Sequence, residues 1–119
     1  MKAKDLLGSR GEDLAAEYLV NAGLRIVERN WRCPSGEIDV VALEGETLVI
    51  AEVKTRSSLA FGHPFEAIGE AKLRRLQLLG AEYAREHGCR DLARRVDAVS
   101  VLDDGTGAPV IEHLKGVGE

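Results

Sequence analysis

Two carboxylates and a lysine stand in stretches of sequence that are otherwise apolar, and they are the residues best suited to chemistry. Asp39 lies in one such stretch, and Glu52 and Lys54 interrupt the run that begins at Leu48. Solvated charges are unexpected there, because burying a charge without a partner is strongly unfavourable. Two carboxylates in an oxygen-rich site suit Mg²⁺ or Mn²⁺, which keep several waters and often bind phosphates as well.

The turn between these segments decides how the side chains meet. Glu37–Leu43 and Thr47–Lys54 are predicted strands, and a two-residue loop of Gly45-Glu46 would form a type II′ turn with Gly at its first central position. This register sets Asp39 opposite Glu52 at roughly 5 Å. A slip of one residue would move Asp39 to the other face of the hairpin.

Both faces of this hairpin are apolar. One carries Glu37, Asp39, Val41, Leu43, Leu48, Ile50, Glu52 and Lys54, and the other carries Ile38, Val40, Ala42, Thr47, Val49, Ala51 and Val53. We therefore expect the hairpin to lie inside the sheet and to be covered on both sides.

Like charges directly opposite each other destabilise a sheet. A raised pKa on one acid, a neighbouring cation or a bound divalent metal would relieve the conflict, and Lys54, two residues beyond Glu52, supplies one cation. The alternative is a solvated ladder of ion pairs, which is common for Glu and Lys at this spacing. The apolar run argues against that alternative. So does Glu12, a third carboxylate at the inner edge of a predicted helix.

The elements that must position these residues follow a mixed α/β pattern. Apolar residues at helical spacing predict a first helix that Gly23 ends and a second that Gly88 ends. Val-rich segments and the hairpin predict strands on either side of the second helix. The expected helices are Lys4–Ala22 and Phe65–His87, and the expected strands are Leu24–Trp31, Glu37–Leu43, Thr47–Lys54, Val96–Leu102 and, at an edge, Pro109–Leu114.

Composition sets the class of protein. The chain has 119 residues and a net charge of −4, and its apolar fraction of 45% is that of a globular protein, so we expect one domain over residues 1–119. We expect no secretory signal and no membrane span, since the apolar runs are far shorter than roughly 20 residues. Cys33 and Cys89 form no CxxC pair, which favours a reduced, cytoplasmic protein. The acidic balance counts weakly against nucleic-acid binding.

Basic residues gather in the second half of the chain. Between Lys72 and Arg95 there are seven basic residues and three acidic ones. They form either a phosphate-contacting surface or a solvated helix face with ion pairs four residues apart, such as Glu82 and Glu86 with Arg85 and Arg90.

Some polar and aromatic residues have simpler roles. Trp31 could stack on a base, but it is expected in the core. Asp97, in a Val-rich strand, is expected to partner an Arg or a backbone group. The three histidines have no partner at metal-ligand spacing, so no histidine metal site is expected.

Several short motifs, in order, resemble a known family. Gly36-Glu37-Ile38-Asp39 with Glu52-Val53-Lys54-Thr55-Arg56 resembles the PD-(D/E)xK signature of restriction-endonuclease-like proteins. Nearly the whole chain, about residues 8 to 101, resembles the bacterial YraN family of candidate endonucleases. The further matching stretches are Gly8 with Gly11-Glu12, Arg29-Asn30-Trp31-Arg32, Phe61-Gly62-His63-Pro64 and Arg95-Val96-Asp97.

The resemblance implies a restriction-endonuclease-like fold, in which α-helices flank a mixed β-sheet. It implies that Asp39, Glu52 and the backbone carbonyl of Val53 bind Mg²⁺ or Mn²⁺, and that Lys54 positions or activates the attacking water. Glu12 matches the helix-borne acid of archaeal Holliday-junction resolvases, which share this fold. Ile38 departs from the signature, which often has Pro before the Asp, and this leaves the substrate class open.

The function expected from this resemblance is metal-dependent hydrolysis of DNA phosphodiester bonds, on branched or damaged DNA among other substrates. Arg32 and Arg56 flank the expected site and are the first candidates for phosphate contacts, and Lys72 is a third that would face it. Nuclease relatives often act as homodimers. The alternative function is a noncatalytic nucleic-acid-binding or protein-interaction module on the same fold.

Overall fold

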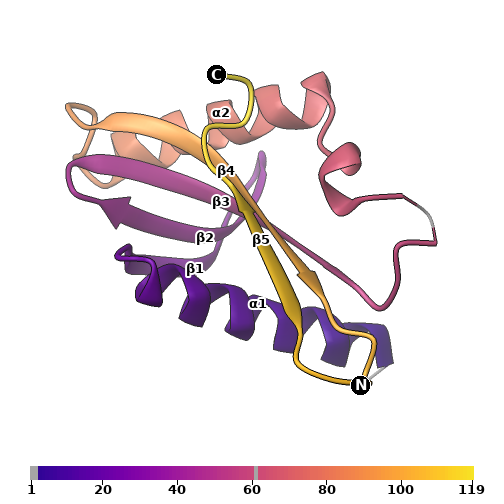
Figure 1. The fold of residues 1–119 in the computed structure, drawn as a ribbon. Helices are drawn as coiled ribbons and strands as arrows, with labels where there is room; N and C mark the ends of the chain where they lie inside the picture. The colour runs from indigo at the N-terminus through magenta and orange to yellow at the C-terminus, as the bar shows by residue number, and fades with distance from the viewer. Residues whose placement is uncertain (1–2, 61) are drawn as a thin grey trace.

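A computed structural model describes residues 3–60 and 62–119; Phe61 of the Phe61–Pro64 motif lies outside them. It is an α/β structure in which two helices flank a five-stranded mixed sheet of order β1-β2-β3-β4-β5 (Figure 1). Only β3 and β4 run parallel, and the other neighbouring strands pair antiparallel. This confirms the predicted fold class. The elements are α1 (Ala3–Asn21), β1 (Arg25–Cys33), β2 (Gly36–Glu44), β3 (Thr47–Arg56), the 3₁₀ turn η1 (Pro64–Ala67), α2 (Glu70–Glu86), β4 (Ala93–Leu102) and β5 (Val110–Leu114).

Each helix covers one face of the sheet with its own apolar core. Leu19 of α1 packs with the first core, and Leu76 of α2 packs with the second. The first contains Val40, Ala42, Val49, Ala51, Val53, Val99 and Val101 from the strands, and the second contains Trp31, Ile38, Val41, Leu48, Ile50 and Val96. The expectation that the hairpin is covered on both sides is confirmed. Within the described residues, no helix is both long and apolar enough to span a membrane.

The register of the hairpin is the predicted one near its turn. Glu44 pairs with Thr47 and Val40 pairs with Ala51, and Gly45 has a φ of 58°, the positive value that the first central position of the turn requires. The prediction that Ile38 shares a face with Val40 is wrong, because Ile38 packs on the α2 side and Val40 on the α1 side. The strict alternation of β2 is therefore broken between these two residues, at Asp39.

The second helix is shorter than predicted. A 3₁₀ turn occupies Pro64–Ala67, and α2 begins only at Glu70, so the single helix expected over Phe65–His87 is wrong at its start. Pro64 fits the first position of a helical turn, but Gly69 is extended, with a ψ of −178°, and it separates the two segments. The end is as predicted, since Gly88 has a φ of 69°.

Two residues have the structural roles that were predicted for them. Trp31 is in the core, with its ring edge-on to Tyr83 at a centroid distance of 5.3 Å. Asp97 is buried and accepts hydrogen bonds from Arg95 Nε at 2.7 Å and from the Gly116 amide at 3.0 Å. Burial acts to raise the pKa of Asp97, but these donors and His113 hold it below its usual value. This carboxylate ties β4 to the C-terminal residues and belongs to the scaffold.

A glycine sets the distance between α1 and β3. A Cβ atom at Gly11 would overlap the side chain of Thr55, whereas one at Gly8, a turn earlier in the same helix, would meet nothing within 4 Å. Glu12 follows Gly11 directly, and Thr55 follows Lys54. The close approach at Gly11 is therefore what brings the helix-borne acid next to the end of β3.

This contact gives a stability prediction with an internal control. Gly11→Ala should destabilise the protein by about 1–3 kcal/mol, the usual effect of overpacking, because neither backbone can easily move away. Gly8→Ala should stabilise it by about 0.5–1 kcal/mol, since Ala is the better helix former and has room. Urea unfolding of both variants measures the difference. Equal effects of the two substitutions would contradict the close approach.

Candidate metal and active site

The hairpin opens where the two acids stand. Regular pairing of β2 with β3 ends at Val40 with Ala51, and the next contact is made by a side chain: the Val53 amide donates a hydrogen bond to Asp39 Oδ2 at 2.8 Å. Glu52 is only 7% exposed. Both acids thus lie beside the backbone of Val53, but Asp39 and Glu52 are not the cross-strand partners that the predicted register had them be.

The Asp39 carboxyl group is held in its neutral form. Burial is the main cause, the hydrogen bond and charge of Glu52 and the charge of Glu12 add to it, and together they raise the pKa of Asp39 to about 8 despite the Val53 amide. A raised pKa is one of the three ways in which the repulsion was expected to be relieved.

The cation beside Glu52 is Lys72, not Lys54. Lys72 Nζ, on the first turn of α2, lies 3.0 Å from Glu52 Oε2. The counter-charge expected from Lys54 is supplied by Lys72 instead, because α2 crosses the face of the sheet on which Glu52 lies. Lys54 instead lines a cleft with Leu7, Gly8 and Glu12 of α1. Among the residues whose side chains are described, Lys54 forms no ion pair.

A third and a fourth acid approach from the α1 side and are bridged by Asn30. With its amide nitrogen turned toward the acids, Asn30 donates to Glu12 Oε1 at 2.9 Å and to Glu37 Oε1 at 3.1 Å. Burial raises the pKa of Glu12, although Arg29 and Asn30 act in the opposite sense. Asn30 has a φ of 53°, the one positive value outside glycine in residues 3–60 and 62–119. Sequence reasoning missed this residue, whose only signal is that Asn tolerates this conformation.

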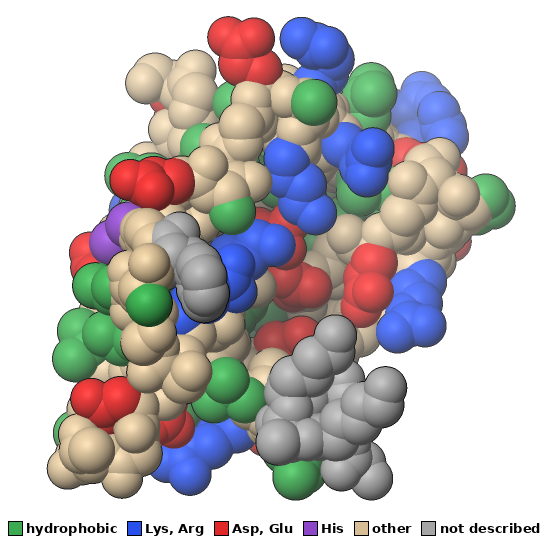
Figure 2. Space-filling model, turned by 90° about the vertical axis from the view of Figure 1, so that its right-hand side faces the viewer, with side chains coloured by type: hydrophobic (Ala, Val, Ile, Leu, Met, Phe, Trp, Pro, Cys, Tyr) green, Lys and Arg blue, Asp and Glu red, His purple; other side chains and the backbone are tan. Residues whose placement is uncertain are grey.

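The predicted phosphate-contacting arginines lie at the border of the site. Arg32 Nε is 3.6 Å from Glu37 Oε2, and the Arg32 side chain is 78% exposed. Arg56 lines the same cleft as Lys54 and donates to the carbonyl of Thr55 at 3.0 Å. Figure 2 shows acidic side chains gathered in a hollow of this face, with lysine and arginine side chains beside them. The contacts of Arg32, Arg56 and Lys72 with phosphate stay predictions.

The donor set fits a hard divalent cation. Where side chains are described, no three His, Cys, Asp or Glu residues form a ready cage, so an ion here would be held by Asp39, Glu52, the Val53 carbonyl and water. These are all oxygen ligands, and Mg²⁺ and Mn²⁺ bind proteins through one or two carboxylates while retaining water. The hydrogen bond from the Val53 amide to Asp39 places this carboxylate beside the backbone segment that follows Glu52.

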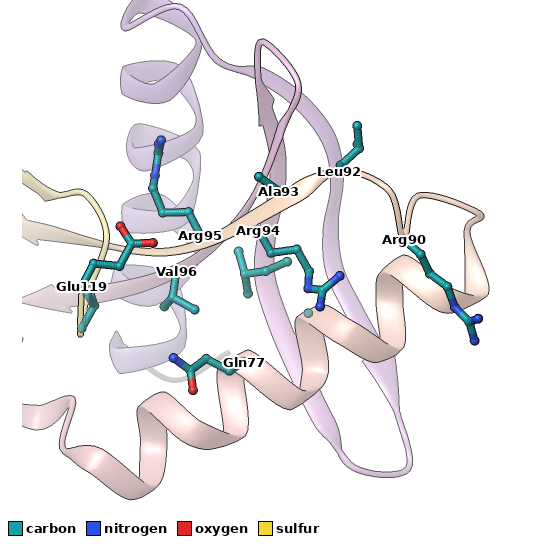
Figure 3. A pocket seen from close by; sticks show the side chains of 11 residues that line it. Gln77, Arg90, Leu92, Ala93, Arg94, Arg95, Val96 and Glu119 are labelled. Atoms are coloured by element: carbon teal, nitrogen blue, oxygen red, sulfur yellow. The ribbon is translucent and has the colours of Figure 1, made fainter.

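A larger cavity lies elsewhere. It measures about 420 Å³ and is bordered by the start of β4, α2 and the C-terminal residues, with Gln77, Arg94, Val96 and Glu119 among its lining (Figure 3). We call the open end of the hairpin, with Asp39, Glu52 and the backbone of Val53, the hairpin fork. Neither of its two acids lines this cavity. This cavity therefore contains none of the candidate metal ligands.

The raised pKa of Asp39 predicts that the stability of the metal-free protein depends on pH. Because the pKa of Asp39 rises from 3.8 to about 8 on folding, its neutral form stabilises the fold at low pH, and this contribution is lost as the pH rises toward 8. The Asn side chain of Asp39→Asn is neutral at every pH, so this variant keeps the contribution. The variant should gain about 1–3 kcal/mol relative to the parent between pH 5 and pH 8. Urea unfolding in the presence of a chelator measures this gain.

The same unfolding measurement is repeated with Mn²⁺ and with a control variant. Mn²⁺ should stabilise the parent by mass action, and Asp39→Asn should lose this response. Asp91→Asn, at an exposed position outside the fork, should follow the parent throughout. An undiminished response to Mn²⁺ in Asp39→Asn would place the ion elsewhere.

Comparison with known proteins identifies the family. The pattern of a family described as uncharacterised protein family UPF0102 matches residues 11–101. A UPF0102 protein of Arthrobacter sp. (strain FB24) is 66% identical over 118 residues, which is 99% of this chain and 100% of the relative. One from Streptomyces griseus is 49% identical over 118 residues, 98% of this chain and 99% of the relative. The chain therefore belongs to the UPF0102 family, the YraN family that its sequence motifs resemble.

Proposed function

We propose that the protein is a divalent-metal-dependent endonuclease of the PD-(D/E)xK superfamily that hydrolyses DNA phosphodiester bonds, on branched or damaged DNA among its substrates. The observation that carries this proposal is the fork itself. Asp39 and Glu52, half-buried and buried, lie beside the backbone of Val53, and Lys72 supplies a positive charge to Glu52. A structural ion pair needs one acid, not two in an apolar part of the sheet.

Each residue has a distinct role in this proposal. Asp39, Glu52 and the Val53 carbonyl would hold Mg²⁺ or Mn²⁺, which lowers the pKa of a bound water and neutralises charge on the phosphate. Lys54, two residues beyond Glu52 on β3, would orient water or stabilise the developing negative charge. Glu12 lines the same cleft as Lys54 and would orient water or a second ligand from the α1 side.

The outer surface of α2 supports a nucleic-acid partner. Five exposed arginines on α2, on the connection to β4 and at the start of β4 form no ion pair within the described part of the chain: Arg74, Arg75, Arg85, Arg90 and Arg94. The alternative of a helix face neutralised by pairs with Glu82 and Glu86 is therefore not what the structure contains. Unpaired arginines are available for phosphate oxygens.

A noncatalytic module is the second candidate function. The net charge of −4 favours it, because nucleic-acid enzymes of this size are more often basic. We place either activity in the cytoplasm. A homodimer would bring two sites to the two strands of a duplex.

The catalytic role of Lys54 separates the two functions. Lys54→Met should lower the rate of cleavage by about 10²-fold or more, the usual effect of removing one transition-state donor, and should leave folding and Mn²⁺ uptake nearly unchanged. Lys115→Met is the matched control, since Lys115 pairs with Glu44 on an exposed part of the surface. Linear, flapped and four-way DNA with Mg²⁺ or Mn²⁺ are the substrates. Parental cleavage by Lys54→Met, per folded molecule, would remove Lys54 from the mechanism.

Binding is tested separately from chemistry. Arg32→Ala and Arg56→Ala should each weaken DNA binding and lower the slope of log K against log salt by about 1, because each removes one phosphate contact. Arg25→Ala should change neither, since Arg25 pairs opposite Leu43, at the end of β1 remote from the fork. Gel shifts over a salt series provide the slopes. If both site variants retain the parental slope, the DNA runs across another face.

A further inference from the structure

The ion pair between Lys72 and Glu52 joins two elements across the α2 face of the sheet. Lys72 Nζ lies 3.0 Å from Glu52 Oε2, and the side chains are 36% and 9% exposed, respectively. Glu52 is thus paired with a lysine that still reaches solvent. A partner that is itself accessible can leave without a buried cation being stranded, since only its carboxylate partner would need a new counter-charge.

The position of Lys72 on its helix favours release. Lys72 is in the first turn of α2, where the helix dipole disfavours a cation, and Gly69 at the N-cap provides no side-chain cap to offset the exposed amides. The helix therefore contributes nothing to holding this ammonium group in place. Glu52 is the one carboxylate in the described structure that pairs with it.

Charge balance leads to a specific role. With Asp39 and Glu52 ionised, a divalent cation on both carboxylates would replace Lys72 as the counter-charge of Glu52. The ammonium of Lys72 would then lie close to the ion without its carboxylate partner, and a phosphodiester group is an anion that it could contact. On this basis, and on the proposed function, we infer that Lys72 is a counter-ion which the metal displaces from Glu52, and that its ammonium contacts a nucleic-acid phosphate only when metal is bound.

This role differs from that of a permanent phosphate contact such as the one predicted for Arg32. Arg32 is 78% exposed and its contact with Glu37 is loose, at 3.6 Å, so it is free for phosphate with or without metal. Lys72 is engaged by a nearly buried acid until the metal arrives. Metal binding and nucleic-acid binding are thereby coupled through one side chain, and the coupling is reciprocal.

Metal affinity is the first measurement, and it does not depend on activity. Lys72→Met should bind Mn²⁺ at least about tenfold more tightly than the parent in calorimetric titration, because a positive charge that competes for Glu52 is removed. Lys72→Gln, which keeps a hydrogen-bond donor for Glu52 and removes only the charge, should show the same direction if Lys72→Met folds poorly. Lys72→Arg, which keeps the charge, and Lys115→Met, which removes a distant one, should bind as the parent does.

Nucleic-acid binding is the second measurement. A short duplex is titrated in a chelator and again in Ca²⁺, an oxygen-binding cation used here to hold the site occupied. Lys72→Met should bind the duplex as the parent does in the chelator and several-fold more weakly in Ca²⁺. Arg32→Ala should be weaker in both. A loss of the same size for Lys72→Met in both conditions would overturn metal-gated contact.

The outcomes distinguish this inference from the proposed function. If the parent binds Mn²⁺ at the fork but Lys72→Met and Lys72→Gln bind it no more tightly, the displacement of Lys72 is wrong and the metal site stands. If the parent binds no Mn²⁺ at the fork, both are wrong. Tighter binding by both charge-removing variants, with a duplex contact that appears only with Ca²⁺, supports the inference.

Discussion

Like-charge repulsion at the open end of the hairpin is the constraint on which this structure depends. Asp39 and Glu52 meet in an apolar strand pair, and Glu12 and Glu37 stand close by. Without compensation, such a group would destabilise the sheet. The chain compensates with a proton on Asp39, the Val53 amide, the ammonium of Lys72 and the amide of Asn30.

The scaffold places these compensating groups by backbone geometry. Gly11 lets α1 approach β3 closely enough for Glu12 to reach the cleft, and the positive φ of Asn30 turns its amide between two acids. The parallel crossover from β3 to β4 carries α2 over the opposite face and sets Lys72 above Glu52. Lys72 thus reaches Glu52 from α2, and Lys54 lines the cleft beside α1.

Local patterns predicted the parts that local physics decides. The Gly45 turn, the hairpin register near it, the core position of Trp31 and the pairing of Asp97 with Arg95 are all as the sequence indicated. The face of Ile38 and the partner of Glu52 were predicted wrongly. Both depend on where distant segments cross: the break at Asp39 faces an unusual backbone conformation in β1, and Lys72 is twenty residues from Glu52. Residue spacing along a strand carries no information on either.

The central claim is that the hairpin fork binds a divalent cation, and the Val53 amide is its most direct reporter because it donates to Asp39. Proton–nitrogen NMR spectra of the apo protein, titrated with substoichiometric Mn²⁺, locate the ion through paramagnetic broadening. The account predicts that the amide signals of Val53 and its neighbours in β2 and β3 disappear first, and that Asp39→Asn abolishes this effect. Broadening that begins instead at the acidic turn of Asp103 and Asp104, with the Val53 signal intact, would contradict the account.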